Sequence, residues 1–270
     1  FEVVGLGCGF GPLNNRFFPP MGSILYWLRP NTIRLPPWPS RVPLTSGDTR
    51  GPVDVALYGG LLVMLVVSLC SDGSGPIPEL GSDVGVLPVW QTVAVLALLA
   101  LAGLRDKVIF LAARGEVYGA LAVCFLFSGA DIVLAAKLVC LLIWMGAATS
   151  KLNKHFPFVI STMMSNNPVI RPRSIKRRFF EHFPDDLRPG RASRWLAHFS
   201  TAIEMLVPLV LFFSHGGWVT AIAAVVMLCF HFGILSAIPM GVPLEWNVFM
   251  MFSVLALFVG NAGIGLGDLN

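Results

Sequence analysis

Long apolar runs separated by shorter polar segments make up most of the chain. A membrane-spanning helix needs about 20 predominantly apolar residues, so these runs predict an all-α, polytopic membrane protein with about seven transmembrane helices. Arg114 and Glu116 interrupt the third run, so a shorter third span over 116–130 is an alternative. The predicted spans cover residues 53–70, 86–104, 108–127, 131–150, 195–214, 219–238 and 246–262.

The first 52 residues follow a different pattern. Residues 1–10 are typical of the end of a helix that begins upstream, and residues 11–52 combine proline, arginine and aromatic side chains. Proline breaks helices, and Trp, Tyr and Arg together favour the headgroup region. We therefore expect an interfacial belt on the membrane face, with a solvated linker as the alternative. Its aromatic side chains Tyr26, Trp27 and Trp38 are candidates for docking a partner protein.

The composition agrees with a membrane protein. Hydrophobic residues make up 55% of the chain, charged residues 13%, and the mean hydropathy is +0.74, which excludes an ordinary soluble domain. The five cysteines include no C-x-x-C pair and lie mostly inside apolar runs, so we expect neither a disulfide framework nor a metal site. The expected parts are residues 1–52, a transmembrane domain over 53–262 and a tail over 263–270, with both ends incomplete.

The basic residues alternate with the predicted spans. If residues 11–52 lie on the inner side, seven spans also place residues 105–107 and 151–194 there. Of the 19 Lys and Arg residues, only Arg114 and Lys137 fall outside these three regions, and the loops expected on the other side contain none. Since Lys and Arg near span ends set the orientation of a membrane protein, the pattern predicts that the basic loops are cytoplasmic.

Residues 166–194 form the most basic loop, with eight Lys and Arg residues. Beside a membrane span, such a cluster favours anionic lipid headgroups over nucleic acid, at about 1 kcal/mol per basic residue. Binding of a phosphorylated or other anionic substrate is an alternative function of this loop. The segment 184–190 is typical of an ordered turn. The candidate lipid-binding residues of this loop are Arg173, Lys176, Arg177 and Arg178.

Ionisable residues inside apolar runs usually face a partner or a cavity, because a charge near the bilayer centre costs at least about 2.5–3.5 kcal/mol. At 1.5 Å per residue, Glu204 lies roughly 14 Å into the fifth span and His231 roughly 10 Å from the inner end of the sixth. As neighbouring antiparallel spans, these helices could bring the two residues together. The pair would handle protons, bind a ligand or only join two helices. Lys137 is expected to pair with Asp131 or Glu116, with extension of its side chain toward the outer headgroups as the alternative.

A second group of polar residues lies at the inner ends of the spans. Lys151 and His155 are four residues apart and share a face if the helix continues, and His198 enters the fifth span from the same side. A Lys beside an apolar pocket loses its charge more easily and becomes a usable base, with His155 and His198 as candidate ligand contacts. The alternative is that Lys151 and Lys154 only extend to the headgroups.

Five phrases resemble a family of uncharacterised bacterial transmembrane proteins that is common in mycobacteria and related actinobacteria. They are GLGCGFGPL at 5–13, RLPPWP at 34–39, SNNP at 165–168, PDDLRP at 184–189 and MGVPLEWN at 240–247. The resemblance covers nearly the whole chain. It implies a multi-pass protein of the bacterial inner membrane, and the family brings no established activity.

A more distant resemblance covers about residues 141–257. The phrases AATSKL at 147–152, EMLVP at 204–208 and HFGI at 231–234 resemble the horizontally transferred transmembrane domain, which includes vitamin K-dependent gamma-carboxylase. This resemblance implies that Lys151 is a catalytic base that deprotonates a reduced quinone. It makes Glu204 and His231 its buried support, and an isoprenoid quinone or a lipid its ligand. The large lumenal domain of the carboxylase has no counterpart here, so gamma-carboxylation itself is not expected.

Several functions are therefore open. The first is a membrane enzyme, or a degenerate enzyme, that acts on a quinone or lipid with Lys151 as base. The second is an accessory or scaffold subunit of a larger inner-membrane complex, which could be respiratory, photosynthetic or lipid-transporting. A transporter ranks last because the chain has no internal repeat. A haem site at His198 and His231 is a further alternative, although no phrase around either residue is typical of haem binding.

Overall fold

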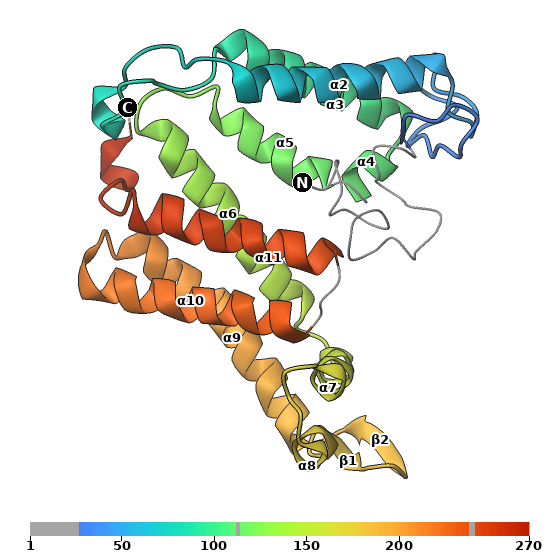
Figure 1. Cartoon of the computed structure of the whole chain (residues 1–270), viewed down its shortest axis with the longest axis vertical. Coiled ribbons are helices and arrows are strands. Elements are labelled where there is room, and N and C mark those ends of the chain that lie inside the picture. Colours follow the sequence, from blue (N-terminus) through green and yellow to red (C-terminus); the bar gives the residue numbers. More distant parts are fainter. Residues whose placement is uncertain (1–26, 112–113, 238–240, 270) are drawn as a thin grey trace. The chain divides into compact units, whose positions relative to one another are not determined.

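The computed structural model describes residues 27–111, 114–237 and 241–269 (Figure 1). The chain divides into two compact units, Phe1–Ala135 together with Asn270, and Ala136–Leu269. Helices dominate both units, and the only named strands of the described ranges form one short hairpin. The all-α membrane fold that the apolar runs predict is confirmed.

Four described helices are long and apolar enough to cross a membrane. They are α2 (Pro52–Cys70), α6 (Asp131–Ser150), α9 (Arg191–Phe213) and α10 (Gly217–Ala237). These correspond to the first, fourth, fifth and sixth predicted spans, and α6 matches its predicted bounds. Helix α9 starts earlier than predicted, because the basic first turn that the hydropathy pattern leaves out is also helical.

The other three predicted spans contain shorter apolar helices. The second is α3 (Val89–Arg105), of 17 residues, and the seventh is α11 (Gly241–Ser253), continued by the π-helical stretch η2 (Val254–Val259). The third prediction is wrong as a continuous helix: α4 (Val108–Leu111) and α5 (Gly115–Cys124) are separate. Arg114 has a φ of 52°, a left-handed conformation that an α-helix cannot contain. The ten residues of α5 rise only about 15 Å, half the thickness of a bilayer core.

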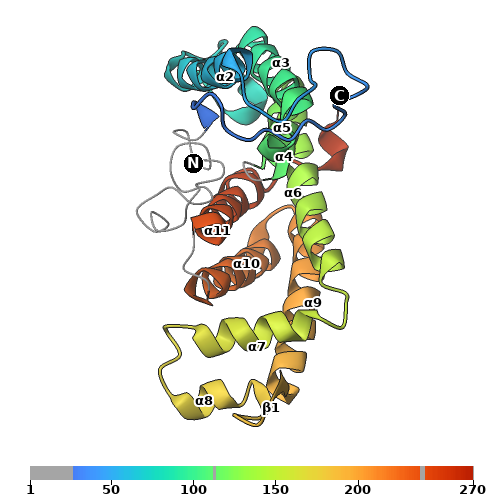
Figure 2. The same ribbon diagram turned by 90° about the vertical axis from the view of Figure 1, so that its right-hand side faces the viewer.

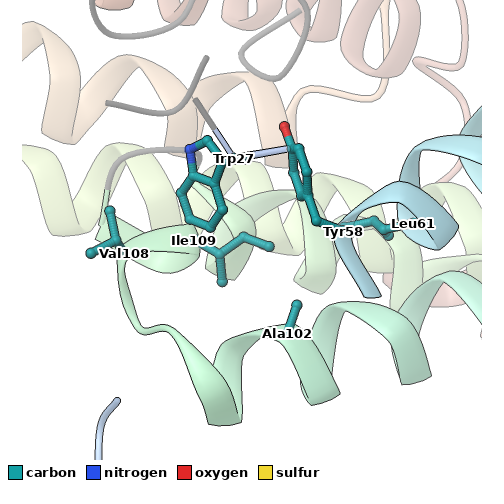
Figure 3. Close-up of a cluster of buried hydrophobic side chains, with 6 residues drawn as sticks. All are labelled: Trp27, Tyr58, Leu61, Ala102, Val108 and Ile109. Atoms are coloured by element: carbon teal, nitrogen blue, oxygen red, sulfur yellow. The ribbon is translucent and has the colours of Figure 1, made fainter. Parts of the chain in front are cut away.

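The first unit is built on α2 and α3, which lie side by side, with α4 and α5 packed against α3 (Figure 1). One buried cluster joins these helices to the residues that precede α2. Figure 3 shows the Trp27 and Tyr58 rings facing each other in it, with their centroids 5.3 Å apart. The buried members of the cluster are Trp27, Tyr58, Leu61, Ala102, Val108 and Ile109.

Residues 27–51, here called the arginine segment, are held to the ends of α2 and α3 by buried ion pairs. Arg34 Nη1 lies 3.2 Å from Asp54 Oδ1, and Arg50 Nη2 lies 2.5 Å from Asp106 Oδ2. Arg105 contacts the same Asp54 carboxylate at 2.6 Å. Arg34 and Arg50 are each 2% exposed. The sequence pattern predicted headgroup contacts for the basic residues of this segment, whereas these two are internal to the protein.

The second unit contains α9 and α10, which pack together and are joined by a tight turn, with α11 and η2 packed on α10. Between α6 and α9 lie α7 (Phe156–Asn166), α8 (Arg173–Arg177) and the hairpin of β1 (Phe180–His182) and β2 (Asp186–Pro189). Figure 2 shows this hairpin and α7 beside the first turns of α9. Residues 151–190, here called the basic subdomain, are therefore folded rather than an extended loop.

The hairpin passes directly into α9 at Gly190. A Cβ atom at this position would lie 2.7 Å from the carbonyl oxygen of Phe180, too close for any other residue without a shift of the backbone. The amide of Gly190 donates to the carbonyl of Phe179 at 2.9 Å, and Ser193 Oγ donates to the same carbonyl at 2.7 Å. These contacts fix the start of α9 against the basic subdomain. A small element, η3 (Leu266–Asp268), follows at the end of the chain.

Candidate functional site

An ion pair joins the end of α6 to the middle of α9. Lys151 directly follows the last residue of α6, and its Nζ donates to Glu204 Oε2. The Lys151 side chain is 22% exposed and that of Glu204 is 6% exposed. The Glu204 side chain is therefore enclosed by protein, whereas the Lys151 side chain stays partly accessible. The structure brings together two of the three residues that the sequence proposed as a site.

Aromatic rings bound the ammonium on two further sides. Lys151 Nζ lies 5.8 Å from the centroid of Phe156, on α7, and 5.9 Å from the centroid of Phe230, on α10. A cation this close to a ring face is attracted by the π electrons, and the rings also exclude water. The ammonium thus lies between one carboxylate and two apolar rings, an environment suited to a ligand with a polar tip and an apolar body.

Pro208 explains part of the local backbone around Glu204. It lies within α9 and is fully buried. Because proline has no N–H, the carbonyl of the residue four positions earlier, Glu204, lacks its helical hydrogen bond. The acid and the proline that follows it therefore place a buried carboxylate and a backbone carbonyl that lacks its usual helical donor at the same point of α9.

His231 takes partners that the sequence reading did not assign. Trp144 Nε1 donates to His231 Nε2 at 3.0 Å, and His231 Nδ1 lies 2.7 Å from Asn247 Oδ1. An amide oxygen only accepts, so Nδ1 carries the proton, Nε2 is the acceptor and the ring is neutral. The predicted Glu204–His231 pair is therefore wrong, because both ring nitrogens are used by α6 and α11. For the same reason His231 has no nitrogen free to bind haem iron.

His231 still lies near the ion pair. The neighbouring Phe230, whose ring contacts Lys151, packs edge-on against the His231 ring with centroids 5.4 Å apart. Trp144 is 1% exposed and His231 is 2% exposed. Trp144 lies two helical turns before Lys151 on α6, so its hydrogen bond sets the rotation of the helix that presents Lys151.

Trp144 and Asn247 are the residues of this region that the sequence analysis missed. Asn247 is a polar side chain inside a predicted span and is 3% exposed, so a search for buried amides as well as ionisable groups would have found it. Trp144 shares a helical face with Lys151, since seven residues are close to two full turns. Its indole N–H needs a partner when buried, and that need was a second usable signal.

Lys137 is also paired differently from the prediction. Its Nζ donates to the backbone carbonyls of Asn261 at 2.8 Å and Ile264 at 2.5 Å, and lies 5.7 Å from the Phe258 ring centroid. The predicted pairing with Asp131 or Glu116 is not what the structure has. Lys137 instead satisfies carbonyls that follow the π-helical end of the last helix, which is a structural role.

The remaining candidate ligand residues lie away from the ion pair. His155 and His198 are exposed, and no contact joins either of them to Lys151 within the described ranges. Arg177 stacks near the Phe183 ring, with 5.7 Å from its Cζ to the centroid. The four basic residues predicted to bind lipid belong to α8 and its end, and all but the half-buried Lys176 are exposed: Arg173, Lys176, Arg177 and Arg178.

The residues predicted to dock a partner protein differ in their exposure. Trp27 is 3% exposed and part of the core of the first unit, so its assignment to a docking surface is corrected. Trp38 is 52% exposed, as a docking residue has to be. Tyr26 lies outside the described residues.

A comparison with protein families gives a match over the whole chain. No curated protein and no solved structure matches the chain. A family described as transmembrane protein of unknown function, DUF3556, matches residues 1–270. Together with the helices long enough to cross a bilayer, this match identifies the chain as a multi-pass membrane protein that belongs to the DUF3556 family.

Proposed function

We propose that this protein binds a lipid-soluble ligand, an isoprenoid quinone or a lipid, at Lys151 and accepts a proton from it. The observation that carries the proposal is the Lys151–Glu204 ion pair, in which the Glu204 side chain is 6% exposed and the Lys151 side chain 22% exposed. The orientation belongs to the same proposal, with the basic subdomain on the cytoplasmic side of a bacterial inner membrane.

The chemistry follows from the cost of keeping two charges away from water. When an apolar ligand covers the ammonium, transfer of one proton from Lys151 Nζ to Glu204 Oε2 leaves a neutral amine and a neutral carboxylic acid. The amine then takes the proton of a ligand hydroxyl, which regenerates the ammonium and leaves the ligand oxygen as an anion beside it. No oxidant is needed for this step.

His231 is a positioning residue in this scheme. Its two hydrogen bonds join α6, α10 and α11. Trp144, on α6, is one of the two partners, so the network holds the helix that directly precedes Lys151. A network in which every member is satisfied gives a helix interface one defined geometry, and Lys151 needs a defined position to meet a ligand.

A second function is favoured by a different observation. The arginine segment presents large apolar side chains on a frame held by ion pairs: Leu44 is 87% exposed, Ile33 is 69% exposed and Trp38 is 52% exposed. Exposed apolar residues on a rigid frame suit contact with another membrane protein. In this second proposal the chain is an accessory or scaffold subunit of a larger complex, and Lys151 is only a headgroup anchor.

Native mass spectrometry of the full-length protein, extracted gently from its own membrane, distinguishes the two functions. The ligand hypothesis predicts one quinone or lipid per chain in the wild type and its loss in Lys151→Ala. Lys107→Ala is the matched control, since it removes an exposed Lys of the first unit that forms no ion pair with any described residue, and should keep the ligand. Stoichiometric protein partners without a small ligand, released by Trp38→Ala and unaffected by Lys151→Ala, would overturn the ligand hypothesis in favour of the subunit.

A further inference from the structure

The basic subdomain contains a hollow of about 350 Å³. Four segments line it: the link between α6 and α7, the first turn of α7, the β1–β2 hairpin and the first turn of α9. None of the residues proposed above for ligand binding or proton transfer is in its wall. The charged and titratable residues that line it are Lys154, Glu181, His182, Asp186, Arg188 and Arg194.

Two arginines of the hollow are held in place by carboxylates of the hairpin. Arg188 Nη2 donates to Asp186 Oδ2 at 2.6 Å, and its Nε lies 3.0 Å from both carboxylate oxygens. Arg194 Nη1 donates to Glu181 Oε1 at 2.6 Å and to the carbonyl of Pro189 at 2.8 Å. A guanidinium has five N–H donors, so each arginine is oriented and still has N–H groups unused by any described residue.

The other cation of the hollow is unpaired. Lys154 Nζ makes no hydrogen bond or ion pair with any residue that the structure describes. The two carboxylates, by contrast, are already engaged by arginines. The Arg188 hydrogen bonds hold the pKa of Asp186 at about 2, so this carboxylate stays ionised and Arg188 stays in place at neutral pH. The hollow therefore offers positively charged N–H donors to a ligand, whereas both of its carboxylates are already bound to arginines.

The chain topology gives the depth of the hollow relative to the bilayer. Helix α7 has 11 residues and rises about 16 Å, too short to cross a core of about 30 Å. The end of α6 and the start of α9 therefore lie on one side of the membrane, and the hollow lies between them. Trp195 and Phe199, 64% and 47% exposed, stack at 4.8 Å between centroids just after Arg194. Such exposed aromatic residues mark the headgroup level.

We propose that this hollow binds one phosphate group, held by Lys154 as a point charge and by the free N–H donors of Arg188 and Arg194. Oriented guanidinium groups and a nearby ammonium match the charge and the acceptor oxygens of a phosphate ester. Either an anionic lipid headgroup or a soluble phosphate ester presents this chemistry. The site is independent of the Lys151 proposal and stands even if that proposal fails.

The test uses the full chain in phosphatidylcholine nanodiscs with two probes. In one arm inorganic phosphate is titrated, with sulfate and chloride at equal ionic strength; in the other, the nanodiscs contain increasing phosphatidic acid. Native mass spectrometry and thermal unfolding report occupancy. Saturable binding in the first arm identifies a soluble phosphate ligand, and saturable binding only in the second identifies a lipid headgroup. Absence of saturable binding in both arms overturns the proposal.

Variants separate a built site from general attraction by positive charge. Lys154→Gln should weaken binding about tenfold, the size expected for one charge-assisted hydrogen bond, and Arg188→Lys should weaken it while keeping the net charge. Arg171→Gln is the matched control, since it removes one exposed charge of the same subdomain outside the hollow, and should change binding less than about twofold. Equal losses in Lys154→Gln and Arg171→Gln would contradict the proposal. Lys154 is exposed and unpaired, so its replacement leaves the fold intact.

Discussion

The arginine segment, residues 27–51, and the basic subdomain, residues 151–190, are alike in sequence and opposite in structure. Both combine proline, arginine and aromatic residues next to a span. In the arginine segment, Arg34 and Arg50 are 2% exposed and bound to carboxylates at the ends of α2 and α3. In the basic subdomain, the Arg188 side chain is 76% exposed and its carboxylate partner belongs to the same hairpin.

The difference shows that the location of the acidic partner decides what an arginine does. Asp54 and Asp106 lie at helix ends, so pairing with them draws the arginine segment onto the helices and uses its charge for folding. The acidic partners within the basic subdomain are local, so its cations stay at the surface, where a ligand or a headgroup can reach them. A count of basic residues cannot distinguish these two outcomes.

The largest expected effect is on the arginine segment. Asp106→Asn leaves Arg50 buried without its ion pair, and loss of one member of a buried pair costs about 3–5 kcal/mol. Denaturant unfolding of the purified full chain in detergent measures this change. Asp48→Asn is the matched control, because this exposed Asp forms no ion pair with any residue that the structure describes, and should change stability by less than about 0.5 kcal/mol. Similar stabilities for both variants would mean that the segment is not held by its charges.

A smaller effect is expected at the buried network of the second unit. His231→Phe leaves the buried Trp144 Nε1 without its acceptor, and an unsatisfied buried polar group costs about 1–3 kcal/mol. The same unfolding measurement checks it. The companion variant Trp144→Phe, alone and combined with His231→Phe, completes a double-mutant cycle, and the double variant should lose less stability than the sum of the two single losses. Additive losses would show that the rings, rather than their hydrogen bond, stabilise the helices.

The ion pair of Lys151 should separate stability from ligand binding. Lys151→Met combined with Glu204→Leu removes both charges, so no uncompensated charge stays buried, and stability should lie within about 1 kcal/mol of wild type. Ligand occupancy in native mass spectrometry should nevertheless be lost. A double variant that keeps its ligand would refute a role for the pair in binding. The pair would then have only a structural role, like the ion pairs of the arginine segment.

The smallest effect concerns the exposed hairpin pair. Hydrogen bonds from Arg188 lower the pKa of Asp186 from its ordinary 3.8 to about 2. A carboxylate with a lowered pKa in the folded state stabilises the fold above its ordinary pKa, and this contribution is lost as the pH falls through the folded value. The Asp186–Arg188 pair should therefore contribute its full stabilisation above about pH 4 and lose it as the pH falls to about 2. The carboxyl carbon shift of Asp186 in NMR reports the titration, and Arg188→Gln should move its midpoint upward.

Much of the architecture follows from the sequence, because the ability of a segment to cross a membrane is a local property. An apolar run of sufficient length must satisfy its own backbone groups as a helix, and so α2, α6, α9 and α10 were predictable within a few residues. The exception is the third run. The left-handed conformation of Arg114 breaks it, and hydropathy carries no information about a single backbone angle. The polar positions Lys151, Glu204 and His231 were recognisable for a similar reason, since ionisable groups in apolar runs are rare.

Only the tertiary structure decided how these groups pair. Glu204 binds Lys151 rather than His231, His231 binds Trp144 and Asn247, and Lys137 binds backbone carbonyls. The hollow of the basic subdomain depends in the same way on how a hairpin folds against α9. These choices depend on the rotation and depth of each helix relative to its neighbours. Side-chain packing over many residues sets both, and no spacing within one run specifies them.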